Sequence, residues 1–84
     1  MAPEFNGQVL IIEDEPVIAL ELEILLGELG FRSFDIADCP ADALACARAH
    51  RPELITADYR IFSGTGVEAV EMITAAVEIG RAHV

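Results

Sequence analysis

The stretch from Val9 to Pro16 restricts the folds open to this chain more than any other. It reads Val-Leu-Ile-Ile-Glu-Asp-Glu-Pro, so four apolar residues run directly into three acidic residues and a proline. A short, unbroken run of branched apolar residues is typical of a strand that is buried on both faces. Acidic residues are unfavourable in strands, whereas proline is favoured in the first turn of a helix. We therefore predict a buried strand with acidic side chains at its carboxyl end and a helix directly after them.

Composition limits the partners that such a chain can have. The 84 residues suit a single domain, and 54% of them are hydrophobic, which favours a packed core over disorder. Fifteen acidic residues against five arginines give a formal net charge of -10. This charge disfavours nucleic acid and anionic membranes as direct partners and favours a cation or a basic protein surface. No apolar run has the length of a membrane span or of a signal peptide, so we expect a cytoplasmic protein.

Helical and extended patterns alternate along the rest of the chain. The patterns predict, after the first strand, a helix, a strand, a helix, a strand and a helix over residues 17–29, 31–37, 40–50, 54–57 and 67–79. The segment 59–66 contains Ser-Gly-Thr-Gly and is predicted to be a loop. Short strands that alternate with helices indicate an α/β fold with a parallel sheet.

The first predicted helix is apolar on two faces rather than one. The stripe expected to pack on the sheet consists of Ile18, Leu22, Leu25, Leu26 and Leu29. A second stripe, about 120° or more around the helix, consists of Val17, Leu20 and Ile24. Because a helix that covers one sheet needs only one apolar stripe, we predict that the second stripe contacts another element or another chain.

Acidic residues stand at the ends of two predicted strands. The third strand ends at Asp58, as the first ends at Glu13 and Asp14. If these parallel strands are neighbours, the three carboxylates converge at one edge of the sheet, where ligands bind in such folds. Converging carboxylates repel one another unless a cation lies among them, and hard oxygen ligands suit Mg²⁺ or Mn²⁺. A metal ion there can neutralise charge during phosphoryl transfer. The alternative is that the acids are solvated residues at strand ends and helix caps.

Three segments of the chain resemble a known family. Val9–Pro16, Pro52–Asp58 (Pro-Glu-Leu-Ile-Thr-Ala-Asp) and Gly66–Glu68 (Gly-Val-Glu) are similar to the receiver domain of bacterial two-component response regulators. The resemblance runs from about Gln8 to Ile79 in register and without gaps. It implies a three-layer, flavodoxin-like α/β fold and a role in phosphorelay signalling rather than a separate enzymatic activity.

The resemblance also implies a role for each site residue. Asp58 would accept a phosphoryl group from a histidine kinase or a phosphotransfer protein. Asp14 would bind Mg²⁺ directly and Glu13 through water, while Asp58 and the backbone carbonyl of Arg60 complete the protein ligands. Many receivers have proline at the position of Phe62, so the loop after Asp58 departs from the family pattern.

Only the first three of the family's five βα units are similar to this chain. The resemblance therefore implies strand order 2-1-3, with the third strand at an exposed edge of the sheet and no counterpart of the family's strand-end hydroxyl residue and lysine. The stripe of Val17, Leu20 and Ile24 would be the surface that the family's fifth helix covers. We accordingly expect impaired phosphotransfer, and a homodimer or swapped assembly that supplies the missing surface.

Other interpretations of the chain concern its function and its ends. The alternatives to a phosphoacceptor are a non-enzymatic dimerisation or interaction module and a magnesium-dependent phosphatase-like fold, although the latter would need an Asp-x-Asp pair that the sequence lacks. We interpret residues 1–7 as a leader, 8–79 as a partial receiver domain and 80–84 as a tail, with both ends foreign to the native protein. Cys39 and Cys46 are predicted to be free thiols, and His50 and His83 ordinary surface residues.

Overall fold

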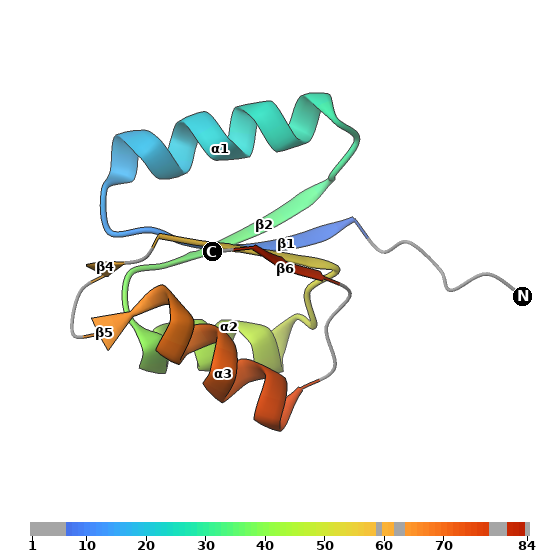
Figure 1. The fold of residues 1–84 in the computed structure, drawn as a ribbon. Coiled ribbons are helices and arrows are strands. Elements are labelled where there is room, and N and C mark those ends of the chain that lie inside the picture. Colours follow the sequence, from blue (N-terminus) through green and yellow to red (C-terminus); the bar gives the residue numbers. More distant parts are fainter. Residues whose placement is uncertain (1–6, 59, 62–63, 78–80, 84) are drawn as a thin grey trace, which may run out of the picture.

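The computed structural model describes residues 7–58, 60–61, 64–77 and 81–83. The chain forms, in order, β1 (Gln8–Ile12), α1 (Pro16–Glu28), β2 (Ser33–Ala37), α2 (Pro40–Ala49), β3 (Leu54–Ala57), β4 (Arg60–Ile61), β5 (Gly64–Thr65), α3 (Gly66–Ala76) and β6 (Arg81–His83). A central parallel sheet separates α1, on one face, from α2 and α3 on the other (Figure 1). The α/β class and the three layers that the sequence predicts are therefore confirmed.

The central sheet has the strand order β2-β1-β3-β6, and all its pairs are parallel. The predicted order 2-1-3 is confirmed. At the carboxyl end of β1, Ile12 pairs with Ala37 of β2 and with Ala57 of β3. Because β1 is a central strand with α1 on one face and α2 and α3 on the other, all five of its residues are buried. The apolar run that opens the sequence thus forms the centre of the sheet.

Two predictions about strands are wrong. The third strand is not an edge, because β6 pairs with β3 from Leu54–Arg81 to Thr56–His83 and satisfies the backbone groups that an edge would expose. The interpretation of residues 80–84 as foreign to the native protein stays a prediction. The predicted loop 59–66 contains β4 and β5, which pair antiparallel. The side chain of Ile61 is buried in the core, and this burial anchors the short ladder that composition alone did not reveal.

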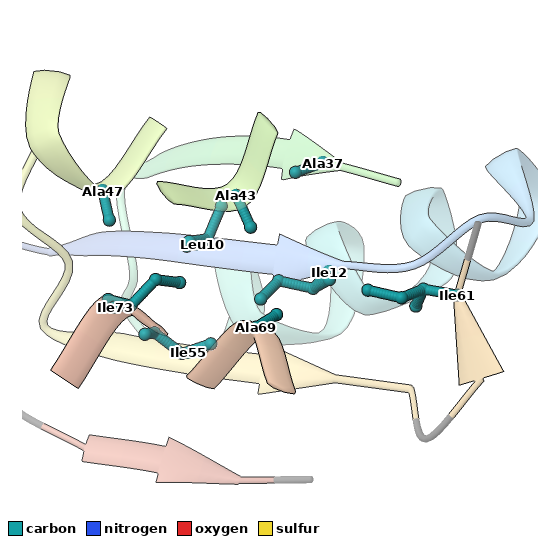
Figure 2. Packing of buried hydrophobic residues seen from close by; sticks show 9 residues of the cluster. All are labelled: Leu10, Ile12, Ala37, Ala43, Ala47, Ile55, Ile61, Ala69 and Ile73. Carbon is teal, nitrogen blue, oxygen red and sulfur yellow. The ribbon is translucent and has the colours of Figure 1, made fainter. Parts of the chain in front are cut away.

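The larger part of the core lies between the sheet and the helices α2 and α3. Leu10 and Ile12 of β1 face Ile55 of β3 and Ile73 of α3 (Figure 2). Alanines form the helix side of this core, which lets both helices approach the sheet closely. These alanines are Ala43 and Ala47 of α2 and Ala69 of α3. Ile73 is fully buried on the inner face of α3, and Val70 and Val77 pack partly buried against the same core.

Among the described elements, only α1 covers the other face of the sheet, and this helix is incompletely buried. Ala19 and Leu26 are buried and Leu22 is half-buried against Val9 and Ile11 of β1. The prediction for the first stripe is therefore wrong in part. Three of its members are exposed, because a single helix buries only the narrow face that it turns toward the sheet. These residues are Ile18, Leu25 and Leu29. Within the described part of the chain, no helix has the length and apolarity required to cross a membrane.

The second stripe of α1 is exposed, but it points in a direction that the sequence did not reveal. Val17, Leu20 and Ile24 are each more than half exposed. Leu20 lines a pocket together with Ile36 and Ala37 of β2, so this side of α1 faces β2. The sheet extends from β1 in the opposite direction, through β3 to β6. A further helix beyond β3 would therefore cover the side with Ile18 and Leu25, and the expectation that it covers the second stripe is wrong.

Candidate functional site

The carboxyl ends of β1 and β3 are held in register by hydrogen bonds beyond the last paired residues. The backbone N–H of Asp58 donates to the carbonyl oxygen of Ile12 at 2.9 Å. On the other side of β1, the N–H of Glu13 donates to the carbonyl oxygen of Ala37 at 2.9 Å. The strand ends are therefore fixed relative to one another before any side chain is considered. Glu13 and Asp58 stand on neighbouring strands at the same edge of the sheet.

The structure brings the three predicted acidic residues together at this edge. Oxygens of the Glu13, Asp14 and Asp58 carboxylates all lie within 4.8 Å of one another. Glu13 is buried, with 7% of its surface exposed, whereas Asp14 and Asp58 are exposed. The cluster thus has one carboxylate anchored in the protein and two open to solvent. Three oxygen donors at this spacing fit a hard divalent cation such as Mg²⁺.

Glu13 is the member of the cluster whose surroundings oppose its charge. Burial is the main cause that raises the pKa of Glu13, and the nearby carboxylates of Asp14 and Asp58 raise it further. The backbone N–H of Glu15 donates to Oε2 of Glu13 at 3.2 Å and acts in the opposite direction. The net rise in pKa shows that the folded protein holds an ionised Glu13 at a cost. A cation among the three carboxylates would remove part of this cost.

A pH dependence follows from the pKa of Glu13. Because the folded state binds this proton more tightly than the unfolded state, its stabilising contribution is complete below the ordinary glutamate pKa and is lost as pH rises through the higher folded value. In EDTA at neutral pH, we expect Glu13→Gln to raise the free energy of unfolding by about 1 kcal/mol. The gain should shrink towards pH 4. Urea denaturation across this pH range, with Glu21→Gln on the exposed side of α1 as the control, measures the effect. An equal or larger gain at pH 4 would contradict this explanation.

Gly66 is required because α3 begins in close contact with the residues at the end of β3. A side chain at the first residue of α3 would place its Cβ against the backbone carbonyl oxygen of Asp58, and 3.0 Å from the Cβ of Ala57. Thr65 caps the helix, since its Oγ1 accepts a hydrogen bond from the N–H of Glu68 at 3.1 Å. Sequence reasoning noted Gly66 only as part of a family motif and missed this contact. The glycine lets α3 begin directly beside the acceptor position.

The remaining site predictions rest on backbone that the structure describes only in part. Arg60 is the first residue of β4, two residues after Asp58, and its backbone pairs with Thr65. Its role as a carbonyl ligand stays a prediction. Phe62, which departs from the family pattern, lies outside the described residues, as do residues 1–6, 78–80 and 84.

His50 is a surface residue, as the sequence predicts, and its side chain makes a contact that the sequence does not reveal. Its Nδ1 lies 3.0 Å from Oδ2 of Asp35, which also accepts a hydrogen bond from Nε2 of Gln8 at 3.0 Å. The contact joins the end of α2 to the middle of β2, away from the acidic cluster. The sequence gives no signal for it, because the two residues are adjacent only in the fold. Both cysteines are free thiols, as predicted.

The strand order and the acidic cluster at the carboxyl edge define a receiver-type signalling domain. The family description "response regulator receiver domain" matches residues 9–79, and the chain belongs to this family. It is 36% identical over 81 residues to the phyllosphere-induced regulator PhyR of Methylorubrum extorquens, a match that covers 94% of this chain and 30% of PhyR. Receiver-domain homologues such as PhyR are signalling regulators rather than enzymes.

Solved structures show the same relationship. The receiver domain of PhyR from Erythrobacter litoralis superposes with a TM-score of 0.81 at 32% identity, over 90% of this chain and 60% of that one. PhyR from Bartonella quintana, solved with the anti-sigma factor NepR, superposes with a TM-score of 0.80 at 34% identity, over 89% of this chain and 31% of that one. The chain therefore spans about a third of the full-length regulators that it matches.

Proposed function

We propose that this chain is a phosphoacceptor receiver in which Asp58 accepts the phosphoryl group. Mg²⁺, or Mn²⁺, would be held by Glu13, Asp14 and Asp58, with the backbone carbonyl of Arg60 as a further ligand. The observation that carries the proposal is the approach of the three carboxylates to within 4.8 Å at the carboxyl edge of the sheet. The membership of the chain in the receiver family supports it.

The chain's own residues account for the transfer step. An oxygen of the Asp58 carboxylate forms a bond to phosphorus while the bond to the donor breaks, and the donor leaves with the electron pair. Asp58 is exposed, so a donor can reach it, and its backbone is fixed by the hydrogen bond to Ile12. The buried Glu13 anchors the opposite side of the cluster. When bound, a divalent cation would neutralise the charge that the carboxylates share with the phosphoryl group.

The donor and the wider protein are part of the proposal. A histidine kinase or a phosphotransfer protein would supply the phosphoryl group in the cytoplasm. The similarity to PhyR, which was solved in complex with an anti-sigma factor, supports a whole protein whose output is binding of a regulatory protein. An acidic receiver with a net charge of -10 suits a partner with a basic face.

The proposal is tested by incubating the chain with acetyl phosphate and following its intact mass. With Mg²⁺ we expect slow gain of one phosphoryl group, because the chain has no lysine to neutralise the phosphoryl oxygens. With EDTA in place of Mg²⁺, the rate should fall by at least about tenfold. A rate that does not depend on Mg²⁺, or no incorporation at any Mg²⁺ concentration, would contradict the proposed site.

A second candidate function is self-association without phosphotransfer. The exposed apolar residues of α1 favour it, since Ile18, Leu25 and Leu29 lie on the side of the helix that faces β3. A homodimer could bury this surface. The swapped assembly is less favoured than the sequence suggested, because β6 pairs with β3 within the chain. A monomer throughout a sedimentation velocity series at rising concentration would count against self-association.

A further inference from the structure

A pocket opens on the side of α1 that faces β2, next to the acidic cluster but on the opposite side from β3. Its volume is about 370 Å³, and it lies between α1, the carboxyl end of β2 and the first turn of α2. Its apolar wall includes Leu20 of α1 and Ile36 of β2, each about half exposed. We call this pocket the β2-side groove. Large apolar side chains at a concave surface of this kind are typical of a site that binds a partner.

The charges around the β2-side groove all have one sign. Carboxylates of Glu23, Asp38 and Asp42 line it, and Glu13 and Asp14 reach it from the acidic cluster. Among the residues whose side chains the structure describes, its lining contains no arginine, lysine or histidine. Because the carboxylates come from α1, from the turn after β2 and from α2, the negative potential is concentrated at the groove rather than along one helix. The groove therefore combines an apolar wall with an uncompensated acidic rim.

We propose that the β2-side groove binds an arginine side chain of a partner protein. The guanidinium group would meet the carboxylates of Glu23, Asp38 and Asp42, and its aliphatic stem would cover Leu20 and Ile36. Arginine fits better than lysine, because its planar, weakly hydrated head forms paired hydrogen bonds with carboxylates. Its stem also packs on apolar surface while the charge stays at the rim. The proposal does not depend on Asp58 accepting a phosphoryl group.

The fold leaves the groove accessible to such a partner. Among the described residues, β2 is the edge strand of the sheet and pairs only with β1. A partner can therefore approach from the β2 side without displacing an element of this chain. A phosphoryl donor, in contrast, must approach Asp58, which stands at the end of β3 on the other side of β1. The partner that binds the groove and the phosphoryl donor that approaches Asp58 can thus contact different sides of the domain.

A second copy of the chain is a poor occupant of the groove. A two-fold symmetric contact brings the same patch of both molecules together, so the acidic rims would face each other. Each chain also carries a net charge of -10, which opposes such an approach. Nucleic acid and anionic membranes are disfavoured by the same charge. A basic side chain of another protein is the occupant that the charges favour.

The test uses the ¹⁵N-labelled 84-residue chain in EDTA and the peptide acetyl-Ala-Leu-Arg-Leu-Ala-amide as the probe. We expect amide shifts to concentrate at Leu20, Glu23, Ile36 and Asp42. A peptide with citrulline in place of arginine keeps the shape and loses the charge, so it should bind about tenfold more weakly. Shifts centred elsewhere, or equal binding of the citrulline peptide, would overturn the proposal.

Matched variants test the rim itself. The double variant Glu23→Gln and Asp42→Asn should weaken binding of the arginine peptide about tenfold. The control Glu21→Gln and Glu28→Gln removes the same charge from exposed positions of α1 outside the groove and should change binding less than about twofold. A well-dispersed spectrum confirms that each variant is folded. An equal loss in both double variants would reduce the effect to net charge and overturn the assignment. Self-association of the free chain that the peptide disrupts would assign the groove to a second copy and overturn it as well.

Discussion

Replacing Asp58 with asparagine is expected to abolish covalent incorporation of phosphate from acetyl phosphate. The amide keeps the size of the side chain and the backbone hydrogen bond to Ile12, but it removes the nucleophilic carboxylate. Intact mass after incubation with Mg²⁺ should show the phosphoryl adduct in the wild-type chain and a reduction of at least about a hundredfold in the variant. Because one of three clustered charges is lost, the variant should also bind Mg²⁺ more weakly.

The control for this experiment is Asp38→Asn. Asp38 is also an exposed aspartate directly after a strand, but it is not part of the cluster of Glu13, Asp14 and Asp58. This variant should take up phosphate at a rate within about twofold of the wild-type rate. A phosphoryl adduct that persists in Asp58→Asn would place the acceptor elsewhere. Comparable losses in both variants would mean that the rate depends on the total negative charge of this edge and not on one specific nucleophile.

Gly66→Ala is expected to destabilise the fold by about 3 kcal/mol. The added methyl group would overlap the carbonyl oxygen of Asp58, so either α3 or the end of β3 must move. A domain of this size has only about 4–13 kcal/mol of stability, so the loss is a large fraction of the total. The shift should also disturb the acceptor position, because the displaced atoms belong to Asp58 itself. Urea denaturation followed by circular dichroism measures the loss.

Gly27→Ala provides the matched control for this substitution. Gly27 lies within α1, and a methyl group there would meet no atom within 4 Å. Since alanine is the better helix former, the control should stabilise the protein by about 0.5 kcal/mol. The same chemical change is therefore predicted to have opposite signs at two helical positions. Wild-type stability of Gly66→Ala would show that α3 can shift away from Asp58 without destabilising the fold. This result would contradict the proposed requirement for glycine at position 66.

The position of α1 along the chain follows from the sequence, whereas its rotation about its own axis follows from packing. Helical periodicity located the helix to within a residue, but the stripe that it assigned to the sheet is buried only at Leu26 and half-buried at Leu22. It did not tell which stripe faces β2, because rotation about the helix axis is set by contacts with β1 and β2. The pocket that Leu20 shares with Ile36 shows that the second stripe lies on the β2 side of α1, away from β3 and β6. The candidate groove is invisible in the sequence for the same reason.

The sequence by itself determined the order of the main elements and the residue types of the candidate site. A buried strand, its acidic end and the proline that starts α1 are encoded within Val9–Pro16, and local preferences suffice to read them. The tertiary structure alone decided the distance between Asp58 and the pair Glu13–Asp14, since it depends on the register of β1 and β3. It also decided the pairing of β6 and the burial of Glu13. These features arise from contacts between residues distant in the chain, which local patterns do not specify.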